Sequence, residues 1–296
     1  MEDVWDIVEH HYADNNGTKL HYVTLGEGEP IVFVHGFPDF WYSWRHQMAA
    51  LAPYFKVIAI DMRAYNLSDK PEGVDNYKMD YLLGDIRAVI EDVGEEKVTV
   101  VGHDWGGAIS WHLAMEHQQQ VERLIILNLT HPRGYAGVVA NPTAEQKANV
   151  QYAYDFASST PKGDPVPENV LTLGERNGVA AVGKRYREAL SQSYWDGMMN
   201  YYRANYTEKI SDIDPNMMPD ITCPVLQFHG LKDNAVDKDG LKDTWNWITK
   251  DYTLVTTPAA GHFVQWEAKE LVSETMKSWL LARKDRGKKA EVLKQS

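Results

Sequence analysis

Short apolar segments alternate with amphipathic ones over the first 130 residues. Five of them have the length and β-branched content of buried strands: Thr18–Leu25, Ile31–His35, Lys56–Ile60, Val98–Gly102 and Leu124–Leu127. Apolar residues recur at helical spacing in three stretches between these strands: Trp44–Ala52, Tyr81–Val93 and Gly106–His117. Such alternation of strands and helices predicts βαβ units on a mostly parallel sheet.

The pattern changes after residue 131. Residues 132–220 show helical periodicity and many tyrosines but no strand pattern, and Thr160–Pro167 is expected to be a loop. The alternation then resumes with two strands, Pro224–Gly230 and Tyr252–Thr256, and two helices, Leu241–Ile248 and Trp266–Arg283. We therefore expect an α/β core made of residues 1–131 and 221–296. Residues 132–220 would form a helical cap insert over the carboxyl ends of the strands, where open α/β sheets bind ligands.

Composition narrows the classes of function. The formal net charge of the 296 residues is −12, and a nucleic-acid partner is not expected because phosphate binding needs a basic surface. Met1–Glu9 lacks the basic and apolar regions of a signal peptide, and no segment has the length and apolar character of a membrane span. With Cys223 as the only cysteine, no intrachain disulfide can form, and we expect a cytoplasmic protein.

No metal or cofactor is expected, because neither an H-E-x-x-H nor a C-x-x-C motif occurs in the sequence. The His10-His11 pair is interpreted as a surface pair rather than a ligand set. The oligomeric state is left open by the sequence.

The segment VTVVGHDWGG, residues 98–107, joins an apolar strand to a helix through G-x-D-x-G-G. Its glycines allow the strand and helix to approach closely at a sharp turn, as in the G-x-S-x-G nucleophile elbow of the α/β-hydrolase fold, with Asp104 in place of serine. The N–H of Trp105 would then be free to bind an oxyanion. Taken alone, the same residues also fit an aspartate that merely caps the helix.

Three further motifs occur at strand ends in the order typical of that fold. His-Gly-Phe-Pro at 35–38 lies where the fold places its second oxyanion donor, which we assign to Phe37. Asp233 and His262 each follow one of the two C-terminal strands. The order of nucleophile, acid and histidine matches the fold, so we predict that Asp104, Asp233 and His262 form a catalytic triad.

A carboxylate nucleophile changes the chemistry. It attacks saturated carbon and becomes an alkyl ester of Asp104. His262, oriented by Asp233, would activate the water that hydrolyses this ester, and the N–H groups of Phe37 and Trp105 would bind the oxyanion. Because Asp104 is ionised near neutral pH without help, the histidine serves the second half-reaction. Epoxides and alkyl halides are the substrates that fit.

The leaving group separates these two substrate types. An opened epoxide leaves an alkoxide that needs a proton or strong hydrogen-bond donors such as phenols, whereas a halide needs only weak donors in an apolar site. The expected insert supplies seven candidate phenols, most of which must be packing residues: Tyr152, Tyr154, Tyr186, Tyr194, Tyr201, Tyr202 and Tyr206.

Over nearly its whole length, the chain resembles the epoxide hydrolase branch of the α/β-hydrolases. The motifs that carry the resemblance are HGFP with Trp44-Arg45, the segment 61–69, GHDWGG at 102–107, Asn-Tyr-Tyr-Arg at 200–203 and the contexts of Asp233 and His262. The resemblance implies that water and a small hydrophobic epoxide are the substrates and a vicinal diol is the product.

The resemblance also implies that two tyrosines of the insert bind the epoxide oxygen. The family's N-W-Y-R motif selects Tyr202, and its Y-x-x-x-F pattern selects Tyr152, with Tyr154 as the alternate. Trp105, Phe37 and Tyr154 are the expected substrate contacts.

The sequence departs from this family at two places. The family's R-G-Y-G turn is Arg63-Ala-Tyr-Asn66 here, so a conformation that requires glycine would be strained. Tyr201 replaces the usual tryptophan, which we interpret as a packing change.

Two other hypotheses fit parts of the pattern. Haloalkane dehalogenases resemble the same elbow but often carry asparagine in place of Phe37, and fluoroacetate dehalogenases carry arginines where this chain has Trp105 and Ala108. A halide could still bind the Trp105 indole, so a haloalkane or haloacid dehalogenase is the alternative enzyme. A non-catalytic ligand-binding protein of this fold would be expected to have a broken triad. Some relatives take the acid from the strand end near 128, which Asn128 cannot provide.

Overall fold

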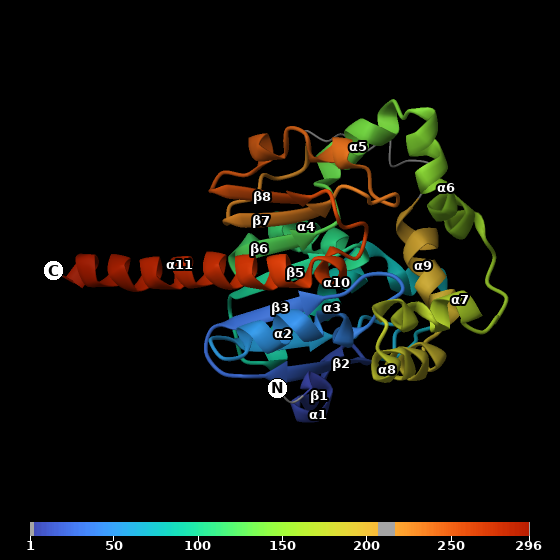
Figure 1. Cartoon of the computed structure of the whole chain (residues 1–296), viewed down its shortest axis with the longest axis horizontal. Helices are drawn as coiled ribbons and strands as arrows, with labels where there is room; N and C mark the ends of the chain where they lie inside the picture. The colour runs from blue at the N-terminus through green and yellow to red at the C-terminus, as the bar shows by residue number, and fades with distance from the viewer. Residues whose placement is uncertain (1–2, 207–216, 296) are drawn as a thin grey trace.

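The computed structural model describes residues 3–206 and 217–295. An eight-stranded sheet in the order β1-β2-β4-β3-β5-β6-β7-β8 forms its centre (Figure 1). The pairs β1/β2 and β2/β4 are antiparallel, and every other neighbouring pair is parallel. The strands are β1 Glu9–Asn15, β2 Thr18–Leu25, β3 Pro30–Val34, β4 Lys56–Ile60, β5 Val98–His103, β6 Val121–Leu127, β7 Val225–Gly230 and β8 Tyr252–Thr257.

Helices cover both faces of the sheet (Figure 1). α2 and α11 pack together on one face, and α3 and α4 on the other. Among the described residues, no helix combines the length and apolar character needed to cross a membrane. The helices are α1 Val4–Ile7, α2 Arg45–Leu51, α3 Met79–Asp92, α4 Trp105–Glu116, α5 Pro132–Ala140, α6 Ala144–Ser158, α7 Glu168–Leu171, α8 Ala180–Ser191, α9 Trp195–Asn205, α10 Val264–Glu267 and α11 Lys269–Gln295.

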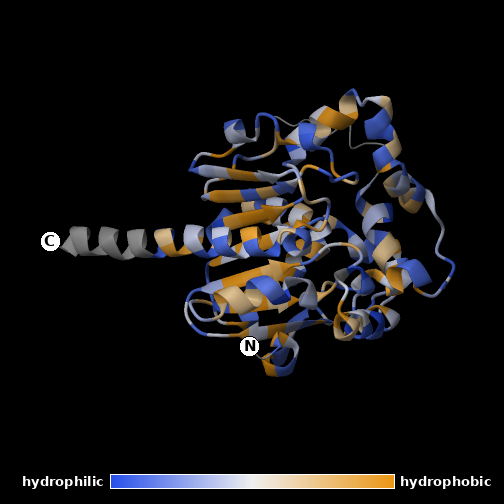
Figure 2. Cartoon of the chain, viewed as in Figure 1, coloured by the Kyte–Doolittle hydropathy of each residue, from blue (hydrophilic) through white to orange (hydrophobic). Residues whose placement is uncertain are grey.

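The central strands are the hydrophobic core of the molecule (Figure 2). Every residue of β5 is buried, and so is every residue of β3 after Pro30, because parallel strands with helices on both faces have no solvent-facing side. β8, at the edge of the sheet, alternates between exposed and half-buried residues over most of its length. All seven expected strands are confirmed to within a few residues.

β1 was not expected from the sequence. Its residues, EHHYADN, are mostly polar, and only Ala13 is buried. β1 pairs with β2 at the other edge of the sheet, where one long side of the strand has no neighbouring strand and polar residues are tolerated. A polar edge strand lacks the apolar alternation on which the prediction of strands depends.

Helices α5 to α9 lie together at the ends of the strands (Figure 1). They follow β6 and precede β7, no strand occurs between 132 and 206, and Thr160–Pro167 is a loop, as expected. Residues 207–216 of the expected insert lie outside the described residues. The division of the chain at 131 and 220 therefore stays a prediction.

The expected helix Leu241–Ile248 is wrong. This stretch contains two short 3-10 helices, η7 Lys238–Leu241 and η8 Thr244–Trp247. Asp243 separates them with a φ of +65°, a left-handed conformation that an α-helix cannot continue through. The expected closing helix is present as α10 and α11, which are separated at Ala268.

Candidate active site

The turn between β5 and α4 places Asp104 at the carboxyl edge of the sheet. Its φ of +51° is unusual for a residue with a side chain. Three glycines make this tight turn possible: a Cβ at Gly36 would collide with the Asp104 side chain, one at Gly102 with the Gly106 carbonyl, and one at Gly106 with the Val34 carbonyl. The predicted elbow is therefore present, and glycine is needed on both sides of it.

The Asp104 carboxylate has partners on both of its oxygens. The backbone N–H of Phe37 donates to Oδ1 at 2.7 Å, and His262 Nε2 lies 3.4 Å from Oδ2. The N–H of Trp105 is the first of α4, where helix N–H groups have no acceptor within the helix. The two N–H groups expected to form an oxyanion hole thus flank Asp104.

The histidine and the second acid form the expected pair. His262 lies in the loop between β8 and α10, and its Nδ1 is 2.9 Å from Asp233 Oδ2. Asp233 Oδ1 accepts hydrogen bonds from the N–H groups of Ala235 at 2.7 Å and Val236 at 3.0 Å. The structure therefore brings Asp104, His262 and Asp233 together in one chain of contacts.

Asn128 has a role that the sequence interpretation missed. It follows β6 with a φ of +43°, and its Nδ2 donates to Asp233 Oδ2 at 2.6 Å and to the Gly261 carbonyl at 3.1 Å. Its Oδ1 accepts the N–H of Gly230 at 3.2 Å. One amide thus connects the acid, the histidine loop and the end of β7. Its position directly after a strand was the available signal, but the sequence interpretation considered only whether residue 128 could supply the acid, which an asparagine cannot.

Electrostatics couple the three groups. Burial alone would lower the pKa of His262, but the charges and hydrogen bonds of Asp233 and Asp104 outweigh it and raise this pKa to about 10. Burial would likewise raise the pKa of Asp104, yet the contact with His262 holds it below the usual aspartate value. Asp233 has a lowered pKa for the same reason. The two carboxylates therefore favour the protonated form of His262.

The loop that carries Phe37 is held by His35, which is fully buried. The Nδ1 of His35 lies 2.8 Å from the Gly36 carbonyl, and its Nε2 accepts the N–H of Met62 at 3.0 Å. Burial lowers the pKa of His35 to about 4, so the ring is neutral and can accept this bond. The backbone around the Phe37 N–H is thereby fixed from within the core.

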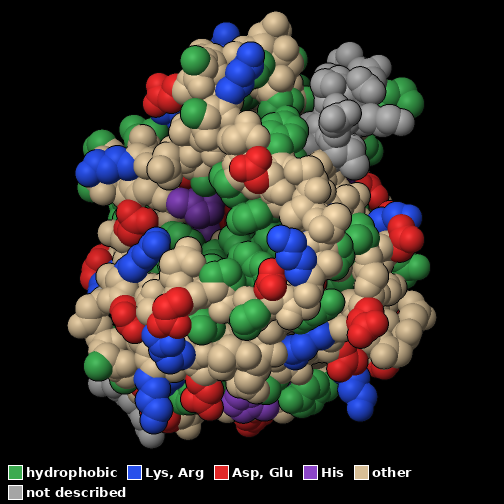
Figure 3. All heavy atoms as spheres, turned by 90° about the vertical axis from the view of Figure 1, so that its right-hand side faces the viewer, with side chains coloured by type: hydrophobic (Ala, Val, Ile, Leu, Met, Phe, Trp, Pro, Cys, Tyr) green, Lys and Arg blue, Asp and Glu red, His purple; other side chains and the backbone are tan. Residues whose placement is uncertain are grey.

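A cavity of about 180 Å³ opens next to Asp104. Figure 3 shows the face with the helical insert, where hydrophobic side chains gather in the middle and charged ones surround them. Core and insert both line the cavity: Met79, Asp104, Trp105, Ala108, His112, Leu129, Thr130, Pro132, Tyr135, Ala136, Val150, Tyr152, Ala153, Tyr202, Asn205, Tyr206, Met218, Ala235 and Val236. Most of this lining is apolar, so the site favours a hydrophobic ligand.

Tyr152 of α6 and Tyr202 of α9 both line this cavity, with ring centroids 6.3 Å apart. Burial and, after it, neighbouring groups including Asp104 raise the pKa of both phenols. Both therefore stay protonated and can donate hydrogen bonds across the physiological range. The two tyrosines and Asp104 thus meet at one cavity, although they come from different parts of the chain.

Of the three expected substrate contacts, Trp105, Phe37 and Tyr154, only Trp105 lines the cavity. Its ring lies 5.1 Å from that of Tyr202. The Phe37 ring packs against Phe156, at 5.8 Å between centroids, and against Tyr202. Tyr154 is also outside the lining and packs on Tyr206. Of the two alternatives in α6, Tyr152 lines the same cavity as Asp104 and Tyr154 does not.

Comparisons with known proteins show the family and the fold of this chain. A family model described as alpha/beta hydrolase fold matches residues 29–269. The chain is 31% identical to epoxide hydrolase 1 of Caenorhabditis elegans, covering 91% of this chain and 69% of the relative. It is 32% identical to an AB hydrolase superfamily protein of Bacillus subtilis, covering 93% and 99%. A Bacillus megaterium epoxide hydrolase, solved with an inhibitor, superimposes with a TM-score of 0.84 at 30% identity, over 91% of this chain and 99% of the other.

Proposed function

The chain belongs to the α/β-hydrolase fold family and, within it, to the epoxide hydrolases, and from this premise we propose that it converts an epoxide to a vicinal diol through a covalent ester on Asp104. The observation that carries the proposal is a carboxylate, not a hydroxyl, at the elbow and facing a cavity with two protonated phenols. A carboxylate nucleophile forms an ester with saturated carbon. Ordinary esterases instead need a hydroxyl at the elbow to accept the acyl group, and this chain has none at that position.

The first half-reaction is alkylation. One carboxylate oxygen of Asp104 attacks an epoxide carbon, and the bond from that carbon to the ring oxygen breaks. The electron pair stays on the ring oxygen, which takes a proton or hydrogen bonds from Tyr152 and Tyr202. Both phenols line the cavity that Asp104 faces, which supports their role as the acid groups of this step.

The second half-reaction is hydrolysis. A water molecule gives a proton to His262 Nε2, and the water oxygen attacks the ester carbon of Asp104. Negative charge then develops on the carbonyl oxygen of the ester. The N–H groups of Phe37 and Trp105 flank this position and stabilise the charge. The bond from the ester carbon to the Asp104 oxygen that carries the substrate then breaks, and the proton on His262 goes to this oxygen, which leaves in the diol. The carboxyl that remains on Asp104 contains the oxygen of water and gives its proton to His262, which restores the resting site.

His262 must change its protonation state between the two half-reactions. In the resting enzyme its pKa of about 10 keeps it protonated, so it cannot accept a proton from water at neutral pH. Esterification removes the charge of Asp104, which is one cause of that high value. The pKa of His262 then falls, its proton replaces the one that the phenols gave to the ring oxygen, and the neutral histidine becomes a base after the ester has formed.

The cavity supports a small hydrophobic substrate. Its volume of about 180 Å³ is mostly surrounded by apolar side chains, and an apolar protein cavity of about 150 Å³ accepts benzene. An epoxide with one aromatic ring or a short alkyl chain is therefore the class of substrate that fits. Water completes the reaction, and no cofactor takes part.

A paired assay with styrene oxide and 1-bromobutane tests the proposal. We expect diol from styrene oxide and little bromide from 1-bromobutane; the reverse would favour a dehalogenase that uses the Trp105 indole as halide donor. Intact mass spectrometry of the His262→Gln variant should show one covalent adduct per chain, because this variant can alkylate but not hydrolyse. Asp104→Asn is the control without adduct. Full turnover by His262→Gln, or an adduct on Asp104→Asn, would contradict the mechanism.

A further inference from the structure

Tyr201 lies next to the epoxide-binding candidate Tyr202 in α9 and faces another way. Successive residues of a helix are rotated by about 100°, and while Tyr202 lines the cavity, Tyr201 does not. The Tyr201 side chain is fully buried, and its hydroxyl donates to the backbone carbonyl of Arg63 at 2.9 Å. A single hydrogen bond therefore joins the middle of α9 to the loop that follows β4.

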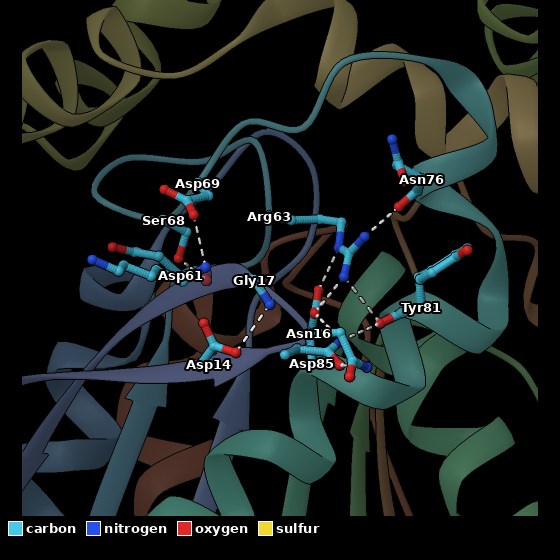
Figure 4. Close-up of polar contacts among 12 residues, drawn as sticks. Asp14, Asn16, Gly17, Asp61, Arg63, Ser68, Asp69, Asn76, Tyr81 and Asp85 are labelled. Atoms are coloured by element: carbon cyan, nitrogen blue, oxygen red, sulfur yellow. Dashed lines mark hydrogen bonds and ion pairs between the residues drawn. The ribbon is translucent and has the colours of Figure 1, made fainter.

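Arg63, whose backbone carbonyl accepts this bond, is held in place by its own side chain (Figure 4). The Arg63 guanidinium is buried and makes two bonds to Asp85 of α3, from Nε at 2.6 Å and from Nη2 at 2.5 Å. It also donates to the backbone carbonyls of Asn76 and Tyr81. Paired bonds between a guanidinium and a carboxylate are strong and directional. The Arg63 backbone thus offers a rigid reference point inside the core.

The same loop holds the start of α9. The Ala64 carbonyl accepts the N–H of Tyr194 at 2.8 Å, and the N–H of Asn66 donates to Ser193 Oγ at 2.8 Å. Ala64 adopts a φ of +76°, the conformation that the family's glycine would allow. Its methyl group occupies space left by Gly197, where a Cβ would lie 2.5 Å away. The positions at which this chain departs from its family therefore meet at one junction with α9.

The contacts around Tyr202 are mostly with aromatic rings, and its hydroxyl also interacts with the side chains of Trp105 and Tyr152. The Tyr202 ring packs on five aromatic rings, of which the nearest are those of Trp105 at 5.1 Å, Phe156 at 5.3 Å and Phe37 at 5.7 Å. Such ring contacts are broad in geometry, whereas a hydrogen bond to a fixed carbonyl sets a position to within a few tenths of an ångström. Among the described residues, the bond from Tyr201 is one of two side-chain hydrogen bonds from α9 to the loop region after β4; the other, from Asn205 to the Tyr77 carbonyl at 2.7 Å, lies at the end of the helix, one turn further from Tyr202.

We propose that Tyr201 is a positioning residue: through its bond to the Arg63 carbonyl it sets α9 so that the Tyr202 hydroxyl reaches the oxygen of the bound epoxide. This inference rests on the proposed function, in which Tyr202 acts in the alkylation step. It replaces the interpretation of Tyr201 as a packing change. Tyr201 itself does not touch the substrate.

Single-turnover kinetics with styrene oxide test the role of Tyr201. The variant Tyr201→Phe keeps the ring and loses the bond, and we expect alkylation to slow about tenfold while hydrolysis of the ester is unchanged. In the Tyr202→Phe background the same substitution should change alkylation by less than about twofold, because the hydroxyl it positions is gone. A merely structural role would slow alkylation equally in both backgrounds.

Tyr77→Phe is the matched control. The Tyr77 hydroxyl donates to the Pro71 carbonyl at 2.9 Å, and its ring lies 5.4 Å from that of Tyr201. Its loss removes a comparable hydrogen bond from the same aromatic cluster without touching the Arg63 carbonyl, so alkylation should keep the wild-type rate. A wild-type rate for Tyr201→Phe, or an equal loss in Tyr77→Phe, would overturn the proposal.

Crystal structures of the wild type and Tyr201→Phe give a readout that does not depend on turnover. The distance from the Tyr202 hydroxyl to the Asp104 carboxylate should change by about 1 Å, a displacement large enough to slow a reaction markedly. An unchanged distance would refute the positioning role even if the enzyme opened no epoxide. Absence of a wild-type adduct together with a shifted hydroxyl would refute the proposed function alone.

Discussion

Replacing Asp104 with asparagine should lower the pKa of His262 by several units. In the wild type, burial opposes the protonated imidazole, but Asp233 and Asp104 together raise its pKa to about 10. The amide of the variant has the shape of the carboxylate and an oxygen that can accept the Phe37 N–H, so the main change is loss of charge. Esterification removes the same charge, and the variant therefore mimics the covalent intermediate.

The size of the effect follows from the distance between the two groups. His262 Nε2 and Asp104 Oδ2 are 3.4 Å apart, and at an effective dielectric constant of about 20 two unit charges at this separation attract by about 5 kcal/mol. That energy corresponds to about 3 to 4 pKa units. His262 of the variant should therefore titrate at about pH 6 to 7, where imidazole is an effective general base.

NMR titration of ¹⁵N-labelled imidazoles measures this pKa directly. Spectra from about pH 5 to about pH 11 cover both expected values, and the His262→Gln variant identifies the resonance. Intact mass must first confirm that the introduced amide has not hydrolysed. If His262 titrates within about half a unit of the same pH in both proteins, the nucleophile's charge does not control the base, and the order of events proposed for the two half-reactions is wrong.

Four further outcomes are expected. Tyr202→Phe should slow alkylation about a hundredfold while Tyr154→Phe leaves it unchanged, as single-turnover rates would show; equal effects would reassign the phenol. Asn128→Ala should reduce the free energy of unfolding in urea by about 1 to 3 kcal/mol and slow ester hydrolysis more than alkylation. If the alkylation rate fell more than the hydrolysis rate, the role of Asn128 beside Asp233 would be wrong. Gly36→Ala should abolish adduct formation because the added methyl group collides with the nucleophile, whereas a normal adduct yield would exclude that collision. Since folding raises the pKa of His262 from 6.5 to about 10, its contribution to stability is complete below pH 6.5 and is lost as the pH rises through 10; the His262→Gln variant should lack this part of the decline in urea denaturation.

The core was predictable because its signals are local. A buried parallel strand is an uninterrupted apolar run, and β3, β4 and β5 all have that pattern. The failures occurred where structure depends on partners. β1 is a polar edge strand that becomes a strand by pairing with β2, and the left-handed Asp243 divides a stretch with helical spacing into two short turns.

The residues of the candidate site also differ in whether local sequence predicts them. Asp104, Asp233 and His262 follow strands, and the carboxyl ends of parallel strands share one edge of a sheet, so strand order alone predicted that they meet. Asn128 and Tyr201 act through hydrogen bonds to residues 105 and 138 positions away in the chain. No local pattern encodes such a pairing, and from the sequence Tyr201 was therefore interpreted as a packing change and Asn128 as a residue that cannot supply the acid.

In the proposed mechanism, the two half-reactions draw on different parts of the molecule. Hydrolysis uses Asp104, His262 and Asp233, which are all fixed to the ends of core strands and to one another. Alkylation also needs Tyr152 and Tyr202, which belong to α6 and α9 and reach the nucleophile only if the insert docks in register with the core. Substitutions at the junction between the insert and the loop after β4 should therefore slow alkylation and leave hydrolysis unchanged. Substitutions next to His262, at Asp233 or Asn128, should slow hydrolysis more than alkylation. An enzyme built this way can change its substrate preference through the insert without changing the machinery that releases the product.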